Sequence, residues 1–226
     1  PPRSTLFPYT TLFRSRERPA TDGEDTLLRL LRAATAAAIT LFAAGSGAIE
    51  PSRIGVSGPF TGGSNPMGIA MRDGIRLAAR EINESGGILG RPILLIERDD
   101  EARPERGAQV VQELINQEKV IAGLGIVNTG VALASQRFYQ QAHIPMITSV
   151  ATGTVITRQF LPPQYPDNYI FRVSAPDSVQ AAMIVEEAGV RRRLRKLAIL
   201  HDSTYYGHLG REDRERALER QTLKPG

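Results

Sequence analysis

The chain has 226 residues, of which 41% are hydrophobic and 23% charged, so it is long enough to bury one or two hydrophobic cores. It contains no cysteine, which excludes a disulfide framework, thiol catalysis and cysteine-based metal or iron–sulfur sites. The net charge is only +4, and the densest basic run, Arg191-Arg192-Arg193, has no interleaved aromatic residues. We interpret this run as a solvated linker face and expect no nucleic-acid partner.

The first 48 residues are expected to lie outside the folded protein. Residues 1–15, PPRSTLFPYTTLFRS, look like the translation of a common DNA-sequencing adapter, and we set them aside as an artefact. Residues 16–48 have the pattern of a secretory signal peptide, since Arg29 and Arg32 precede an apolar run of 12 residues that ends shortly before small residues. This run is too short to span a bilayer as a helix. We therefore expect a mature chain that begins near Ile49 and a soluble periplasmic protein.

From Arg53 onward, short β-branched runs alternate with longer helical patterns. This alternation predicts an α/β protein with a doubly wound parallel sheet. The expected strands are Arg53–Ser57, Ile93–Arg98, Val120–Leu124, Pro145–Ser149, Asn168–Val173 and Lys196–Leu200. The expected helices are Met67–Asn83, Pro104–Gln117, Gly130–Ala142, Ser178–Ala188 and Tyr206–Gln221.

The order of these elements predicts two unequal lobes. Residues 49–173 are expected to form a first α/β ligand-binding lobe, which ends after the proline-rich loop 157–168. Residues 174–226 are expected to form a crossover and the beginning of a second, similar lobe. Since Lys196–Leu200 has no partner strand in that lobe, we expect either that the chain is cut short or that its remaining strands lie elsewhere.

Catalytic and cofactor motifs are weak in this sequence. The run Gly123-Leu-Gly125 begins like a dinucleotide fingerprint, but Asn128 stands where the third glycine belongs and no acidic residue follows at the required distance. Asp99-Asp100 lacks the further aspartate of an acidic metal site, so capping of a loop is the favoured role. His201-Asp202 is interpreted as a structural hydrogen bond. We expect no enzyme activity, no metal and no cofactor.

Polar turns follow two strands of the predicted sheet. Val127-Asn128-Thr129 comes after the third strand, and Val150-Ala151-Thr152 comes after the fourth. Open α/β sheets bind ligands at the carboxyl ends of their strands, and hydroxyl and backbone N–H groups near a helix start favour an anion such as a carboxylate. Adjacent strands would place both turns side by side around one carboxylate. The alternative, equally open from the sequence, is that both threonines are merely helix N-caps.

Several stretches in order also resemble the type I periplasmic binding proteins, specifically the leucine/isoleucine/valine-binding group. The resemblance covers Arg53 to about Leu218. The matching stretches are IGVSGPFTG at 54–62, GIRLAAREINESGGILGRPI at 74–93, DDEARP at 99–104, IPMITSVAT at 144–152 and LAILHDSTYYG at 197–207.

The resemblance implies a set of ligand contacts. Thr129, Thr152 and the main chain at Val127 and Val150 would meet the carboxylate and amino groups of an amino acid, with Tyr206 approaching from the opposing lobe. Met67 falls where relatives often carry a tyrosine, Thr129 where serine is frequent and Val150 where alanine is. The acidic residue that neutralises the amino group would come from a later part of the second lobe.

The expected function is that of a non-catalytic, extracytoplasmic solute-binding subunit of an ABC importer. It would close by hinge motion on an amino acid, branched-chain or similar, and deliver it to membrane permease subunits. A binder of amides, urea or aromatic acids is the alternative within the fold. A ligand-sensing ectodomain without transport and a doubly wound enzyme are the other classes, and the enzyme is disfavoured because no activated nucleophile or cofactor motif is present.

Overall fold

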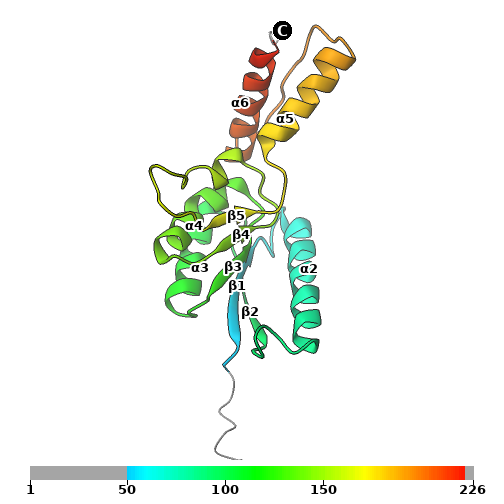
Figure 1. Ribbon diagram of the computed structural model, residues 1–226. Helices are drawn as coiled ribbons and strands as arrows, with labels where there is room; N and C mark the ends of the chain where they lie inside the picture. The colour runs from blue at the N-terminus through cyan, green and yellow to red at the C-terminus, as the bar shows by residue number, and fades with distance from the viewer. Residues whose placement is uncertain (1–49, 222–226) are drawn as a thin grey trace, which may run out of the picture. The chain divides into compact units, whose positions relative to one another are not determined.

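The computed structural model describes residues 50–221. The expected adapter artefact and signal peptide lie outside the described residues. The centre of the structure is a five-stranded, wholly parallel sheet in the order β2-β1-β3-β4-β5 (Figure 1). Its strands are β1 Ser52–Gly58, β2 Ile93–Asp99, β3 Ala122–Gly125, β4 Met146–Thr148 and β5 Ile170–Arg172. The predicted α/β parallel fold and its first five strands are confirmed, with shifted ends.

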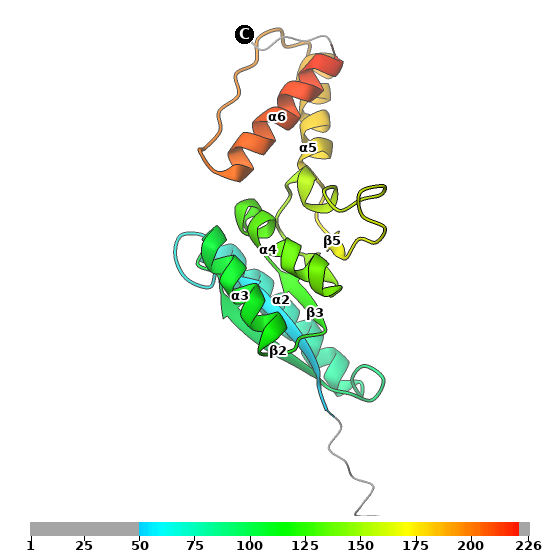
Figure 2. The same ribbon diagram turned by 90° about the vertical axis from the view of Figure 1, so that its left-hand side faces the viewer.

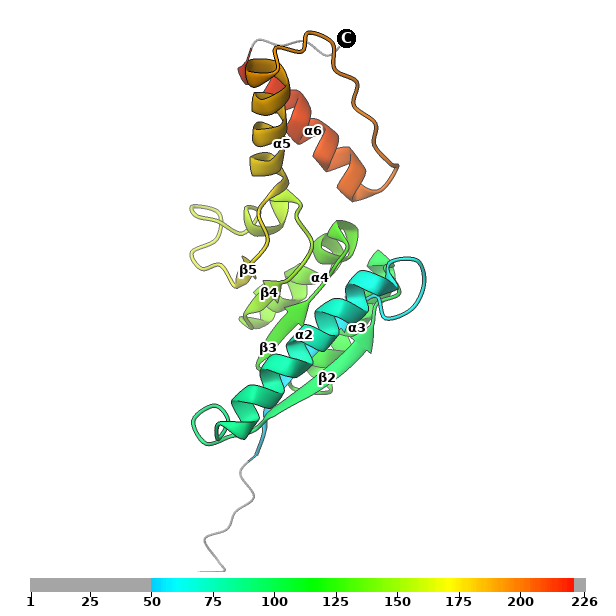
Figure 3. The same cartoon turned by 90° about the vertical axis from the view of Figure 1, so that its right-hand side faces the viewer.

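Helices cover both faces of the sheet. Helices α3 (Pro104–Asn116) and α4 (Thr129–Ala142) lie together on one face, as Figure 2 shows. Helix α2 (Asn65–Glu84) crosses the other face, in front of the sheet in Figure 3. The main core lies between the sheet and the first pair of helices, where Val110, Val111, Leu114, Val131, Tyr139, Met146 and Ile170 are buried together.

Glycines allow a close contact between a strand and a helix, and a tight turn after α2. A Cβ at Gly123 would lie 2.5 Å from the ring of Tyr139, so β3 and α4 approach closely only because position 123 has no side chain. Gly86 and Gly87, which follow α2, have φ angles of 100° and 77°, in the left-handed region that glycine adopts at little cost. They form the turn that the sequence predicts after this helix.

After β5, helix α5 (Asp177–Val185) continues into one π-helical turn (Glu186–Arg191), and helix α6 (Tyr205–Arg220) follows. Helices α5 and α6 pack through a small cluster of Ala181, Val185, Ala217 and Leu218. The predicted solvated face is confirmed at the end of this turn, since Arg191, Arg192 and Arg193 are exposed. Arg191 forms an ion pair with Glu186, and Arg192 forms one with Glu187.

The predicted strand at Lys196–Leu200 is wrong. This segment has no regular secondary structure and pairs with no strand in the part of the chain that the structure describes. A strand needs a neighbour for its backbone N–H and C=O groups, and none is available here. The apolar residues of this segment differ in burial. Leu197 and Ile199 pack against the α5–α6 cluster, whereas Leu200 is 97% exposed.

No helix within residues 50–221 combines the length and the apolar content needed to cross a bilayer.

Candidate functional site

The two polar turns predicted from the sequence lie side by side. Strands β3 and β4 are neighbours, with Gly125 opposite Thr148. Beyond the strands, Ser149 N–H donates to the carbonyl of Gly125 at 2.7 Å, and Ala151 N–H donates to the carbonyl of Ile126 at 3.3 Å. Main-chain hydrogen bonds therefore continue from the sheet into the turns and hold them against each other.

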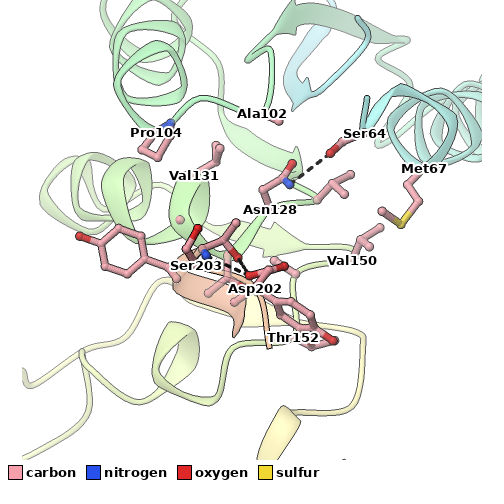
Figure 4. A pocket seen from close by; sticks show the side chains of 17 residues that line it. Ser64, Met67, Ala102, Pro104, Asn128, Val131, Val150, Thr152, Asp202 and Ser203 are labelled. Atoms are coloured by element: carbon pink, nitrogen blue, oxygen red, sulfur yellow. Dashed lines mark hydrogen bonds between the residues drawn. The ribbon is translucent and has the colours of Figure 1, made fainter. Parts of the chain in front are cut away.

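The turns border a cleft of about 650 Å³ (Figure 4). It brings together every residue proposed from the sequence as a ligand contact: Met67, Val127, Asn128, Thr129, Val150, Ala151, Thr152 and Tyr206. The other lining residues were not proposed as ligand contacts from the sequence, and Asp202 was given a structural role. These residues are Ser64, Ala102, Pro104, Gly130, Val131, Asp202, Ser203, Thr204 and Tyr205. Ser64 and the 102–104 segment follow the carboxyl ends of β1 and β2, so the rule that pointed to the two turns would also have found them.

Thr129 has an unusual environment in this cleft. Its side chain is buried, with 2% exposure, and its hydroxyl has no hydrogen-bond partner within residues 50–221. Its methyl group packs against Gly153, where a Cβ would approach it to 2.6 Å. A buried hydroxyl without a partner costs free energy. A ligand atom would remove that cost once the residues that cover the hydroxyl, Gly153 among them, move enough to let it approach.

Thr129 is also the first residue of α4, and Asn128 is the N-cap. The second turn likewise has Gly153 rather than Thr152 at the N-cap of its short 3₁₀ helix, Thr154–Thr157. The alternative that both threonines merely cap helices is therefore wrong. At the start of α4, backbone N–H groups without intrahelical acceptors and the positive end of the helix dipole adjoin the buried hydroxyl, a combination that favours an anion.

Asn128 links this helix start to α2. Its side-chain amide donates to the hydroxyl of Ser64 at 3.4 Å, as Figure 4 shows, while its side-chain oxygen is buried without a partner within residues 50–221. A second polar atom beside the cleft thus has unused capacity to accept a hydrogen bond.

Thr152 is half-buried and borders Asp177, the first residue of α5. Burial raises the pKa of Asp177, and the nearby hydroxyl of Thr152 opposes this effect. The carbonyl of Thr152 accepts hydrogen bonds from Asp177 N–H at 2.9 Å and from the Arg172 guanidinium at 3.1 Å. The turn at 150–152 is therefore held by hydrogen bonds from β5 and from the start of α5.

The apolar and aromatic walls of the cleft are incompletely packed. Met67 on α2 is 53% exposed and Tyr206 on α6 is 47% exposed. Both retain apolar surface that a ligand side chain could cover. The ring of Tyr205 approaches the position of a Cβ at Gly130 to 3.2 Å, so the start of α6 lies against the start of α4.

The aspartates singled out in the sequence have structural partners. Asp99 accepts hydrogen bonds from Phe60 N–H and Glu101 N–H, each at 2.9 Å, and Asp100 accepts one from Ala102 N–H at 2.9 Å. The predicted loop-capping role is confirmed. Burial opposes a low pKa at Asp99, but hydrogen bonds from Thr61 and from backbone N–H groups lower it below its ordinary value.

The predicted structural role of His201-Asp202 is also confirmed. His201 Nδ1 lies 2.7 Å from the carbonyl of Asp202, and Asp202 Oδ1 accepts from Thr204 N–H at 2.9 Å. Hydrogen bonds from Thr204 lower the pKa of Asp202, so its carboxylate is ionised at neutral pH. Asp202 is the one carboxylate among the described residues that line the cleft. No group of acidic or histidine side chains suited to a metal ion occurs in the described range 50–221.

A parallel α/β lobe with a cleft at the carboxyl ends of its strands has the ligand-binding position common to open α/β sheets, and no catalytic group has been identified among the described residues that line this cleft. Comparison with known families identifies it further. A family model described as "Periplasmic binding protein" matches residues 51–224, and the chain belongs to this family.

Relatives of known name support this assignment. The chain is 31% identical over 164 residues to an "Amino acid binding protein" of Pseudomonas aeruginosa, a match that covers 73% of this chain and 42% of that protein. It is 29% identical over 180 residues to "Leu/Ile/Val-binding protein homolog 3" of Brucella melitensis, covering 80% of this chain and 46% of the relative. The chain thus spans less than half the length of these relatives, whose names describe binding rather than catalysis.

Solved structures show the same fold. The branched-chain amino acid transporter substrate binding protein LivJ of Streptococcus pneumoniae, in complex with isoleucine, superimposes with a TM-score of 0.66 at 25% identity and covers 78% of this chain and 47% of its own. A solute binding protein of an ABC transporter from Rhodopseudomonas palustris, in complex with 3,4-dihydroxybenzoic acid, gives a TM-score of 0.63 at 27% identity, covering 76% of this chain and 44% of its own.

Proposed function

We propose that this chain belongs to the extracytoplasmic, periplasmic solute-binding subunit of an ABC importer, and that it binds an amino acid through the carboxylate. The observation that carries the proposal is the buried, unpartnered hydroxyl of Thr129 at the start of α4. A carboxylate oxygen there would accept a hydrogen bond from the hydroxyl and from the N–H groups of the first helical turn. Such charge-assisted bonds are about twice as strong as neutral ones.

Thr152 and the main chain at Val127 and Val150 would complete the carboxylate site from the adjacent turns. Met67 and Tyr206 would contact the side chain of the ligand. The names of the relatives support a branched-chain or similar amino acid, since they are described as binding leucine, isoleucine and valine. Delivery of the ligand to membrane permease subunits is part of the same proposal and rests on family membership.

Asp202 gives the proposal a specific feature for amino acids. Its ionised carboxylate lines the cleft and offers a negative charge to the ligand's ammonium group. The exchange Asp202→Asn retains a side-chain oxygen that can accept the bonds from Thr204, and it removes the charge.

Aromatic carboxylic acids are the second candidate ligands, because one structural relative at 27% identity binds 3,4-dihydroxybenzoic acid. These acids share the carboxylate with amino acids and lack the ammonium group. Both classes of ligand would therefore use the hydroxyl of Thr129. The negative charge of Asp202 would favour an amino acid and disfavour an aromatic acid.

The affinity of this chain is expected to be low. Each hydrogen bond to the ligand contributes about 0.5–1.5 kcal/mol net, or about 1.5–3 kcal/mol where it reaches the charged carboxylate, and the cost of association offsets most of the sum of two or three such bonds. Dissociation constants on the order of millimolar are expected, equivalent to about −4.1 kcal/mol.

Titration calorimetry tests the proposal with leucine, its amide, its decarboxylated amine and 4-hydroxybenzoate. Leucine is expected to bind more tightly than its amide or amine, and Asp202→Asn is expected to weaken leucine severalfold without weakening 4-hydroxybenzoate. Tighter binding of 4-hydroxybenzoate than of leucine, unaffected by Asp202→Asn, would favour the aromatic-acid function. Equal affinity for leucine and its decarboxylated amine would contradict carboxylate recognition altogether.

A further inference from the structure

The segment behind the ligand-facing turn contains a polar junction that the proposed site does not use directly. Thr154 begins the 3₁₀ helix Thr154–Thr157, two residues after Thr152. Its hydroxyl accepts a hydrogen bond from Ser178 N–H at 2.9 Å and donates one to Asp213 Oδ2 at 2.8 Å. One side chain of the first lobe therefore bonds both to the start of α5 and to the middle of α6.

The acceptor of this bond is well fixed. Asp213 is buried, with 5% exposure, and its other oxygen accepts from the Arg216 guanidinium at 2.7 Å. A hydroxyl that donates to a buried carboxylate, which an arginine also contacts, makes one of the stronger hydrogen bonds in a protein. Loss of Thr154 would leave that carboxylate oxygen without its donor, which is more costly than the loss of an exposed bond.

The junction connects two parts of the proposed site. On one side, Thr154 continues from Thr152, whose carbonyl and that of Gly153 are both held by Arg172, at 3.1 and 2.8 Å. On the other side, Asp213 lies on α6, the helix whose first turn carries Tyr206 into the cleft. A single hydroxyl thus joins the turn that would hold the carboxylate to the helix that supplies the aromatic wall.

We propose that Thr154 is a positioning residue that couples α6, and with it Tyr206, to the ligand-facing turn, without touching the ligand itself. This inference rests on the proposed function where it concerns binding. Its mechanical part, the attachment of α6 through Thr154 and Asp213, is independent of any ligand.

The charged surroundings of the junction are mixed. Asp177 at the start of α5 faces Asp213 and Arg214 from α6 and Arg172 from β5. The like charges of Asp177 and Asp213 repel, and the two arginines offset this repulsion. Among the described residues, the hydroxyl of Thr154 is the group that hydrogen-bonds both to α5 and to α6 at this junction. No neighbouring side chain within residues 50–221 is placed to replace these two bonds if the hydroxyl is removed.

Amide hydrogen exchange without ligand tests the mechanical part. Thr154→Val is expected to speed exchange of α6 amides about tenfold relative to amides of α3, as the loss of a hydrogen bond to a charged group implies. Thr154→Ser keeps the hydroxyl and is expected to restore wild-type exchange. Thr157→Val is the matched control, because it makes the same substitution on the same 3₁₀ helix at a hydroxyl that forms no hydrogen bond within residues 50–221.

Asp213→Ala breaks the same bond from α6 and is expected to reproduce the local effect, while the double variant with Thr154→Val should add little to either single change. Unchanged α6 exchange in Thr154→Val, or an equal rise in Thr157→Val or in α3, would overturn the inference. Leucine titration tests the coupling to the ligand. Tyr206→Ala should weaken leucine binding in the wild-type background and weaken it less in the Thr154→Val background. If the losses of binding free energy from the two substitutions simply add, Thr154 does not couple Tyr206 to the site. Failure of every variant, wild type included, to bind any amino acid would refute the proposed function and leave the exchange result to decide the mechanical part.

Discussion

Replacing Thr129 with valine is expected to change stability and ligand binding in opposite directions. Valine has nearly the same shape as threonine, so the methyl contact with Gly153 survives. The exchange removes a hydroxyl that is buried without a partner in the described residues. An unsatisfied buried group costs about 1–3 kcal/mol, so the free energy of unfolding should rise by on the order of 1 kcal/mol and the melting temperature by about 2–4 °C.

Binding should respond with the opposite sign. A ligand carboxylate loses its hydroxyl donor, which costs about 1–3 kcal/mol, or roughly 5- to 150-fold in affinity. Gain of stability together with loss of binding is typical of a group whose partner is the ligand.

Denaturant unfolding followed by circular dichroism measures the stability of Thr129→Val, and an amino-acid titration measures its affinity. Thr152→Val is the informative comparison, because its hydroxyl already lies beside Asp177 and its removal should bring no gain in stability. A loss of stability in Thr129→Val, or unchanged affinity for a carboxylate ligand, would refute the reasoning.

Three further predictions concern the fold. Gly123→Ala should lower the free energy of unfolding by about 1–3 kcal/mol, because the new Cβ would overlap Tyr139. Gly74→Ala lies in the middle of α2 with open space around it and should raise the free energy of unfolding by about 0.5–1 kcal/mol. Thermal unfolding of the two variants compares these effects. Burial raises the pKa of Asp100 from 3.8 to about 6, so the folded state binds this proton more tightly than the unfolded state does. The free energy of unfolding should therefore fall, by up to about 3 kcal/mol, as the pH rises from about 4 to about 6. Urea unfolding across this range should show that the free energy of unfolding depends less on pH in Asp100→Asn than in the wild type. Amides of α5 and α6 should exchange faster than those of β1, β3 and α4, because the apolar core between these two helices is small compared with the main core. Uniform protection would contradict this prediction.

The elements predicted correctly are those whose pattern is local. The alternation of β-branched runs and amphipathic segments fixes β1 to β5 and α2 to α4, and the rule for carboxyl ends of parallel strands leads to the two polar turns. Lys196–Leu200 has the same local pattern as a strand, but a strand also needs a partner, and pairing is a property of the whole fold. Local propensity was not sufficient there.

Parts of the site depend on contacts between distant positions, and no local signal contains them. The bond between Thr154 and Asp213 joins residues 59 positions apart. The bond between Asn128 and Ser64 joins residues 64 positions apart. The sequence shows that Thr129 stands at a helix start, but only the packing of Gly153 against it shows that its hydroxyl is buried without a partner.

The most direct test of the account is an amide chemical-shift titration of this chain with leucine and with its decarboxylated amine, both at millimolar concentrations. We predict that leucine shifts the amides of residues 127–131 and 150–152, that the amine leaves them nearly unchanged, and that Thr129→Val reduces the leucine response. Equal shifts from the amine, or leucine shifts that fall outside these two turns, would contradict the claim that the cleft recognises a carboxylate at the start of α4.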